Sequence, residues 1–326
     1  MDRRTFCQFA ITALMALGCA DAAQAQSYPN RPIKIIVGFP PGGGTDIAAR
    51  LIGQKLSESL GQPVVIENRP GAGGTIGNTA VAKAPADGYT LLLTANGPHA
   101  IAPSLYTNLE YDIFKDYAPI SLVSVSPHVV VVHPSVPANS VAELIAWVKA
   151  QPAPPVYGSA GNGTPAHLAA ELFAAMTGAP LKQVSYRGAA PALAGLMGSE
   201  VKLVFSDLPV AMPNLSGDKL KAIAITSMSR SAMVPNLVTL NESGLKDYEA
   251  LVWTGLLAPA GTPADIVTKL NAEVRRIVNL PDVKERFTTL GSEVAAGTPE
   301  AFAAVIKRDH DRWAKVIKDA GIKLEQ

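Results

Sequence analysis

Cysteine is almost absent from this sequence of 326 residues. Its two cysteines, Cys7 and Cys19, both lie within the first 25 residues, and the rest of the chain contains none. Disulfides, cysteine nucleophiles and thiolate metal sites are therefore excluded for that part. A chain of this length without disulfides depends on burial of a hydrophobic core, and its 48% hydrophobic residues provide the material for about two domains.

Long runs of one charge and long apolar runs are missing as well. The 28 basic and 27 acidic side chains are interspersed, which leaves a net charge of +1. Neither a phosphate-backbone footprint nor a polybasic membrane patch is present, so no nucleic-acid partner is expected. Beyond the first 25 residues, no apolar run approaches the roughly 20 residues that a membrane span needs. The mature chain is expected to be soluble.

The five histidines show no spacing typical of metal ligands: His99, His128, His133, His167 and His310. We therefore expect no metal site and no cofactor. His310 lies in a charged helical stretch and is expected to be solvated, while His128 and His133 flank a strand and are expected to be structural. His99 and His167 lie near the loops described below and are candidates for a binding site.

The first 25 residues have the pattern of a secretory signal peptide. Arg3 and Arg4 form a short positive region, residues 6–20 are mostly apolar, and Ala25 completes a small-x-small cleavage pattern. Cleavage near Ala25 and export to the periplasm are expected, although a buried N-terminal helix is the alternative. The arginine pair also resembles a twin-arginine signal, and Cys19 lies in a partial lipoprotein box, so the export route and lipidation stay open.

Short β-branched runs alternate with longer amphipathic patterns along the rest of the chain. This alternation predicts an α/β protein with doubly wound, mostly parallel sheets. Strands are predicted at residues 33–39, 64–66, 90–94, 182–186, 201–205, 220–226 and 251–258. Helices are predicted at 47–60, from the glycine-rich turn 71–74 to residue 84, at 140–150 with a capping box, at 165–176, and over most of the chain after residue 262.

Two places in the sequence indicate crossings between two domains. Residues 120–132 read as two adjacent strands that are broken at Ser126-Pro127, and the run at 251–258 is a candidate return crossing. The predicted division therefore assigns residues 26–125 and 251–326 to a discontinuous first domain. Residues 126–250 form the second domain.

Two glycine-rich loops, one in each predicted domain, match each other in pattern. Gly42–Asp46 and Ser159–Thr164 each follow a strand, carry a threonine at the turn and precede an amphipathic helix. The first turn of a helix has unpaired N–H groups and a partial positive charge, and glycine lets them approach a ligand closely. Two such helix starts facing each other would hold a carboxylate without a cationic side chain. The alternative is that both loops are ordinary connections, with Thr45 and Thr164 as helix N-caps.

Motifs for phosphate binding and catalysis are incomplete. No G-x-x-x-x-G-K-[ST] sequence occurs, and the turn at residues 71–74 does not complete G-x-G-x-x-G. An exported hydrolase would need Ser159 or Ser206 activated by a distant histidine, and Ser159 is out of register for a nucleophile elbow. We therefore expect a binding protein that is not an enzyme.

Several segments, in order along the whole mature chain, resemble the Bug family, the extracytoplasmic solute receptors of tripartite tricarboxylate transporters. The matching segments are residues 28–33, 39–46, 65–74, 87–91, 161–168, 186–188 and 257–263. The resemblance implies a type II-like periplasmic-binding-protein fold, in which two α/β domains joined by two crossing segments close on a ligand in the cleft between them. It also implies a ligand carboxylate held mainly by backbone groups of the two loops.

The resemblance and the loop pattern together give the predicted site. Its residues are Phe39, Gly42, Gly43, Gly44, Thr45, Asp46, Asn96, His99, Ser159, Gly161, Asn162, Gly163, Thr164, His167, Arg187, Gly188 and Asp207. Asp207 is interpreted either as a ligand contact or as the cap of the next helix. The expected partners of a monomeric protein are a small organic acid and the permease subunits of a tripartite tricarboxylate transporter. A membrane sensor that receives the same ligand signal is the alternative partner.

Overall fold

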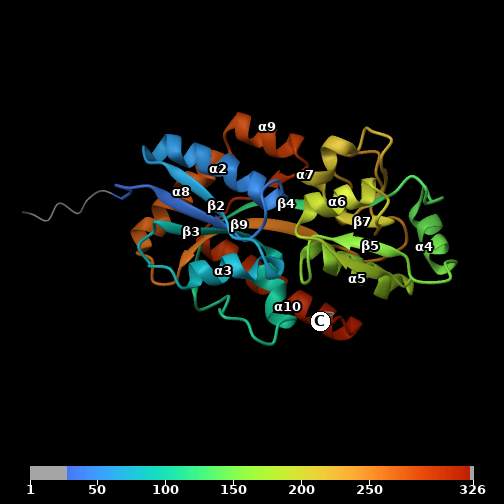
Figure 1. The fold of residues 1–326 in the computed structure, drawn as a ribbon. Coiled ribbons are helices and arrows are strands. Elements are labelled where there is room, and N and C mark those ends of the chain that lie inside the picture. Colours follow the sequence, from blue (N-terminus) through green and yellow to red (C-terminus); the bar gives the residue numbers. More distant parts are fainter. Residues whose placement is uncertain (1–27, 324–326) are drawn as a thin grey trace, which may run out of the picture.

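The computed structural model describes residues 28–323, so the predicted signal peptide lies outside the described residues. Figure 1 shows an elongated α/β molecule with two lobes. The strands are β1 (Ile33–Val37), β2 (Val64–Asn68), β3 (Thr90–Ala95), β4 (Tyr117–Val132), β5 (Val156–Ser159), β6 (Lys182–Ser185), β7 (Leu203–Asp207), β8 (Lys221–Ile225), β9 (Leu251–Pro259) and β10 (Glu293–Val294).

Helices cover the strands on both sides. They are α2 (Gly44–Leu60), α3 (Thr75–Ala82), α4 (Val141–Lys149), α5 (Pro165–Thr177), α6 (Ala189–Met197), α7 (Leu208–Ala211), α8 (Ala264–Val278), α9 (Pro281–Thr289) and α10 (Pro299–Ala320). The predicted capping box of α4 is present, because Ser140 accepts a hydrogen bond from the Glu143 backbone N–H. The turn η2 (Gly97–Ile101) follows β3 directly.

The strands form one continuous sheet in the order β2-β1-β3-β9-β4-β7-β5-β6, with β8 and β10 also paired to β4. In the first lobe β1 is parallel to β2 and β3, and β9 is antiparallel to β3. In the second lobe β5 is parallel to β6 and β7. The predicted alternation of parallel strands and helices is therefore present in both lobes.

The long strand β4 belongs to both lobes. Its first part, up to Pro127, pairs with β9, and its last part, from His128 to Val132, pairs with β7 and β8. The predicted break at Ser126-Pro127 is wrong, since β4 is continuous there. Pro127 lies where β4 changes partner, and a missing backbone N–H is tolerated at such a point because no regular ladder continues across it.

Each lobe has apolar packing on both faces of its sheet. Successive side chains of a strand point to opposite faces. In the second lobe Val130 and Val132 therefore join one buried cluster, and Val129 and Val131 join another. The first lobe divides in the same way, with Ile35 in one cluster and Ile36 in the other.

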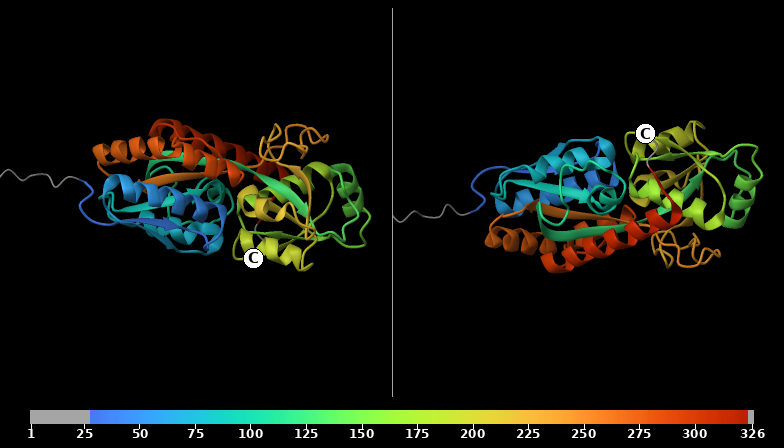
Figure 2. Two further views of the ribbon diagram at one scale, coloured as in Figure 1. Left: turned by 90° about the horizontal axis from the view of Figure 1, so that it is seen from above. Right: turned by 90° about the horizontal axis from the view of Figure 1, so that it is seen from below.

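Helix α10 packs against both lobes. Phe302 and Ile306, in its first half, are buried in a cluster of the first lobe. Trp313 and Ile317, in its second half, are buried in a cluster of the second lobe. Figure 2 shows this red helix extending from one lobe to the other. The predicted division assigns the whole of residues 251–326 to the first domain, whereas the end of α10 packs with the second.

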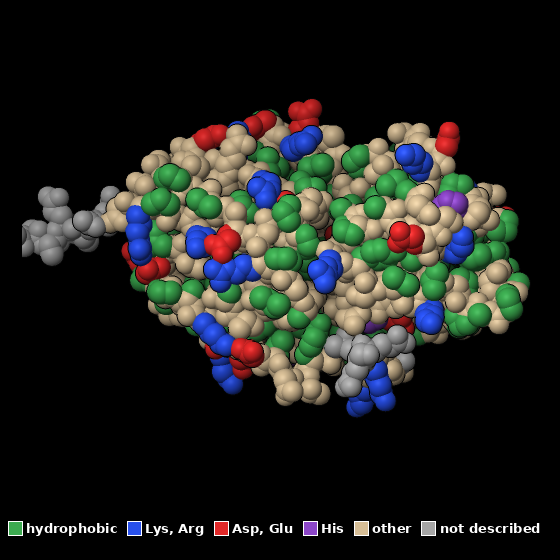
Figure 3. Space-filling model, viewed as in Figure 1, with side chains coloured by type: hydrophobic (Ala, Val, Ile, Leu, Met, Phe, Trp, Pro, Cys, Tyr) green, Lys and Arg blue, Asp and Glu red, His purple; other side chains and the backbone are tan. Residues whose placement is uncertain are grey.

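The surface carries charges of both signs. On the face drawn in Figure 3, basic and acidic side chains are interspersed without an extended patch of one sign. None of the helices between residues 28 and 323 combines the length and apolar character needed to cross a membrane.

Gly255 on β9 allows α10 to lie close to the sheet. A Cβ atom at this position would lie 2.0 Å from the Cζ atom of Phe302. We expect Gly255→Ala to lower the free energy of unfolding by about 1–3 kcal/mol, the usual range for overpacking a core. Urea unfolding measures the change. Gly217→Ala is the control, because a Cβ there would have only the Asn214 carbonyl oxygen within 4 Å, at 3.7 Å. An unchanged urea midpoint for Gly255→Ala would contradict this packing.

Candidate ligand-binding site

A cavity lies where the two lobes face each other. Residues from both lobes form its walls: Phe39, Pro40, Pro41, Gly43, Gly44, Thr45, Ala95, Ala160, Thr164, Pro165, Ala166, Gly188, Ala189, Ala190, Pro191, Asp207 and Val252. Among these described lining residues, Asp207 is the only one with an ionisable side chain. No lysine, arginine or histidine is among them, so any attraction for an anion has to come from the backbone.

The first glycine-rich loop begins α2 at the cavity wall. Gly43 is the N-cap residue with extended backbone angles (φ −80°, ψ 163°), and Gly44 and Thr45 are the first helical residues. The alternative that Thr45 caps the helix is wrong, because no side chain caps α2 and Thr45 is already inside its first turn. The first-turn N–H groups of α2 are consequently not satisfied by a cap and face a cavity that their own residues line.

Asp46 stabilises this loop by hydrogen bonds and does not line the cavity. Its Oδ2 accepts hydrogen bonds from the Gly42 backbone N–H and from Arg50 Nε, both at 2.9 Å. Its Oδ1 accepts one from Asn68, which also donates to the Phe39 carbonyl oxygen. Burial alone would raise the pKa of Asp46, but the hydrogen bonds from Arg50, Gly42 and Asn68 outweigh it and lower the pKa. Asp46 thus remains ionised and fixes the loop geometry.

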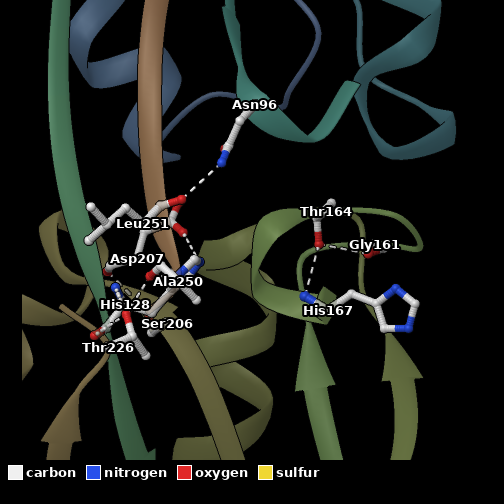
Figure 4. Close-up of polar contacts among 10 residues, drawn as sticks. All are labelled: Asn96, His128, Gly161, Thr164, His167, Ser206, Asp207, Thr226, Ala250 and Leu251. Atoms are coloured by element: carbon white, nitrogen blue, oxygen red, sulfur yellow. Dashed lines mark hydrogen bonds and ion pairs between the residues drawn. The ribbon is translucent and has the colours of Figure 1, made fainter. Parts of the chain in front are cut away.

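The second glycine-rich loop is built differently. Thr164 is the N-cap of α5, and its hydroxyl donates to the Gly161 carbonyl oxygen at 2.7 Å and accepts from the His167 N–H at 3.4 Å (Figure 4). Here the N-cap interpretation is confirmed. Pro165 follows as the first helical residue and has no N–H to donate. Of the first three residues of α5, only Ala166 is left to offer an N–H to a ligand, so the two loops are not equivalent.

A third helix start, which the sequence pattern did not reveal as such, faces the same cavity. Gly188 precedes α6, and Ala189 and Ala190 form the beginning of its first turn and line the cavity. In the sequence, Pro191 shortly after Gly188 indicates this helix start, because proline is favoured in the first turn of a helix. The starts of α2, α5 and α6 therefore converge, and each carries a partial positive charge.

A second and wider cavity adjoins the first. Both are lined by Phe39, Pro40 and Ala160. The wider cavity is also lined by Gly161, Asn162 and Arg187 from the predicted site, together with the turn at residues 70–74. These three residues therefore face the wider cavity and not the space between the helix starts.

Several predicted site residues support the loops without lining either cavity. His167 accepts a hydrogen bond at Nδ1 from the Gly163 N–H, at 3.1 Å. Asn96 donates from Nδ2 to the Leu251 carbonyl oxygen at 2.8 Å, and this bond links η2 to the start of β9 (Figure 4). Gly163 has a positive φ of 71° and a Cβ there would lie 3.1 Å from Tyr106. They hold the cavity walls in place.

The two serines considered as nucleophiles have other partners. Ser159 is buried and its Oγ accepts a hydrogen bond from Gln183 at 2.6 Å. Ser206 is also buried, and its Oγ donates to the Asp207 carbonyl oxygen at 3.3 Å. Within residues 28–323 neither hydroxyl forms a hydrogen bond with a histidine. The hydrolase hypothesis therefore lacks the general base that would activate either serine.

His99 lies in the core of the first lobe, away from the described lining of both cavities. Its Nδ1 is 3.4 Å from Asn78 Nδ2, which can only donate, so the ring proton belongs to Nε2. Tyr117 and Trp253 pack edge-on against the ring. Burial lowers the pKa of His99 to about 3, so the ring is neutral at physiological pH.

The buried, neutral His99 makes stability depend on pH. The folded pKa lies below the unfolded value, so the unfolded chain binds the proton first and stability is lost as pH falls from about 6.5 towards about 3. Between about pH 7 and pH 5 we expect His99 to account for a loss of about 2 kcal/mol. Chemical unfolding of His99→Gln at both pH values should show a loss smaller by that amount. The partly exposed His133→Gln is the control, and equal losses in wild type and His99→Gln would contradict the assignment.

Comparisons with known proteins show which family this chain resembles. The model of the family described as tripartite tricarboxylate transporter family receptor matches residues 48–322. Protein BugT of Bordetella pertussis is 38% identical over 309 residues, which cover 94% of this chain and 95% of BugT. The structure of R. palustris Rpa4515 with adipate has a TM-score of 0.88 at 36% identity, covering 91% of this chain and 99% of that one.

A second solved structure, MatC from Rhodopseudomonas palustris with bound malate, has a TM-score of 0.84 at 34% identity and covers 89% of this chain and all of its own. These similarities confirm the predicted periplasmic-binding-protein fold and the resemblance noted in the sequence. The converging helix starts lie in a cleft of that fold. The chain belongs to the family of tripartite tricarboxylate transporter receptors, which are solute-binding proteins.

Proposed function

We propose that this protein captures a small organic carboxylate in the cavity between its lobes, without chemical conversion of the ligand. The observation that carries the proposal is the convergence of three helix starts on a cavity whose described lining has no cationic side chain. Partial charges on helix starts stabilise an anion there. Proteins similar to this one have been solved with adipate and with malate, both of which are carboxylates.

The two lobes close on the ligand from opposite sides. The proposed division assigns residues 26–125 and 251–326 to one domain and residues 126–250 to the other, and within the described residues the end of α10 packs on the second. The only strand that belongs to both lobes in the described chain is β4, and Ala250 and Leu251 run beside it. Hinge motion at this junction would close a ligand between the two domains and create the closed surface that a partner recognises.

The partner is the membrane permease of a tripartite tricarboxylate transporter, to which the monomeric receptor delivers its ligand in the periplasm. The family supports this assignment. The pattern of the first 25 residues, with cleavage near Ala25, supports export.

A panel of mono-, di- and tricarboxylates tests ligand capture. The correct acid should raise the free energy of unfolding by about 2.7 kcal/mol at a hundredfold excess over its Kd. Differential scanning fluorimetry measures this as a higher melting temperature, and the amide of the same acid is the matched control. The proposal fails if no carboxylate in the panel shifts the transition and none co-purifies with the protein under native conditions.

Gly44→Val tests the site itself. Gly44 lines the cavity, and a Cβ at this position would lie 3.4 Å from Asp207 Oδ2, so two further methyl groups would fill the space at the start of α2. Overpacking of this kind costs about 1–3 kcal/mol, so affinity for the carboxylate should fall about tenfold or more. Isothermal titration calorimetry measures the affinity, and circular dichroism checks folding. Gly217→Val, outside the cavity lining, should bind normally, and normal binding by Gly44→Val would place the ligand elsewhere.

A further inference from the structure

The two lobes also pack against each other outside the ligand cavity, at Gly73. This residue belongs to the short turn η1 (Ala72–Gly74), between β2 and α3 of the first lobe. A Cβ atom on Gly73 would lie 2.5 Å from the backbone carbonyl oxygen of Asn162, in the second glycine-rich loop. Neither residue lines the cavity at the starts of α2, α5 and α6. Backbone from the two lobes therefore meets at a point beside that cavity.

Gly73 differs from two other glycines that face the opposite lobe. A Cβ on Gly44 would lie 3.4 Å from Asp207 Oδ2. A Cβ on Gly188 would lie 3.3 Å from Pro40 Cγ. These distances are close to an ordinary van der Waals contact, and they end on side chains that line the ligand cavity. At Gly73 an added Cβ would overlap a backbone oxygen, which cannot rotate away as a side chain can.

The Asn162 carbonyl is held in place by its surroundings. It accepts a hydrogen bond from the Tyr106 hydroxyl at 3.2 Å. The Tyr106 ring lies against the same loop, where a Cβ on Gly163 would be 3.1 Å from the ring. Gly163 also donates its N–H to His167 Nδ1 at 3.1 Å. The carbonyl therefore cannot move aside without the loss of these contacts.

The turn that carries Gly73 is fixed in the first lobe as well. The Gly74 N–H donates to the Gly71 carbonyl oxygen at 2.9 Å. The Thr75 hydroxyl donates to the Ala72 carbonyl oxygen, also at 2.9 Å. Tightly packed protein transmits strain instead of absorbing it. A side chain at residue 73 would consequently push the two lobes apart.

On the basis of the proposed function, we propose that Gly73 determines how far the lobes close and so sets the affinity for every ligand of the receptor. Restoring an ordinary contact of 3.4 Å with a side chain at residue 73 would separate the lobes by about 1 Å at this point. Because the contact lies outside the ligand cavity, it stabilises the closed form equally for each bound acid. Selectivity among acids is left to the cavity itself.

Gly73→Ala tests this role with succinate, glutarate, adipate, malate and citrate as probes. The affinity of each acid that binds the wild type should fall about tenfold or more, and by the same factor for all of them, because the variant disfavours the closed form itself. Isothermal titration calorimetry measures the affinities. A residue that contacts the ligand would instead change the affinities of short and long acids by different factors.

Gly61 provides a matched control for backbone strain. Its φ is 66°, against 64° at Gly73, and a Cβ there would meet nothing within 4 Å. It caps the C-terminal end of α2, whereas the other end of α2 lines the cavity. Both alanine variants carry the same left-handed strain, so without ligand their melting temperatures should fall by similar amounts. Only Gly73→Ala should lose affinity. Gly73→Asn and Gly61→Asn repeat the comparison with a residue type that tolerates this φ.

Binding rates separate a closing contact from a damaged cavity. Closure follows the encounter with the ligand, so the dissociation rate of Gly73→Ala should rise by about the factor lost in affinity. Its association rate should stay within about twofold of the wild-type rate. Stopped-flow measurement of intrinsic tryptophan fluorescence gives both rates. A loss that lies entirely in the association rate would contradict the role in closure.

The outcomes separate this inference from the proposed function. If Gly73→Ala binds as tightly as Gly61→Ala, or if its loss depends on the length of the acid, the role of Gly73 is wrong and carboxylate capture stands. If the wild type binds no carboxylate at all, the proposed function fails, and this inference fails with it.

Discussion

The first turn of a helix leaves backbone N–H groups without partners, and a buried cavity has to satisfy them with something that accepts hydrogen bonds. Here three helices begin at one cavity, and its described lining offers no cationic side chain. Glycine at residues 43, 44 and 188 keeps side chains away from these helix starts. Asp46, held by Gly42 and Asn68, fixes the first loop without facing the ligand space. The fold therefore brings the partial positive charges of three helix starts to one cavity, and the surrounding residues hold these helix starts in place.

The junction between the lobes connects this local chemistry to motion. β4 gives its first part to one lobe and its last part to the other, and His128 is the first residue paired with the second lobe. The residue opposite it, Asp207, faces Gly44 of the first lobe. The two residues therefore lie where opening and closing of the lobes would change their surroundings. Helix α10, which is buried in both lobes, limits how far they separate.

Local patterns predicted much of the fold, because strands, helix caps and glycine turns leave signals within a few residues. The helices after both glycine-rich loops and the capping box of α4 are examples. The continuous β4 was missed, since its tolerance of Pro127 depends on which strands pair there. His99 was selected for its proximity to a loop in sequence, but burial against Tyr117 is a tertiary property. The two loops have unequal roles because Thr164 caps α5 and Pro165 lacks an N–H. The sequence pattern alone made the two loops look equivalent.

The most direct test of the account is a crystal structure of the protein with its bound acid. The account predicts that the ligand carboxylate lies within hydrogen-bond distance of the backbone N–H groups at the start of α2, between Gly44 and the start of α6, and touches no cationic side chain. A carboxylate bound instead to Arg187 in the wider cavity, with the helix starts facing only water, would contradict it.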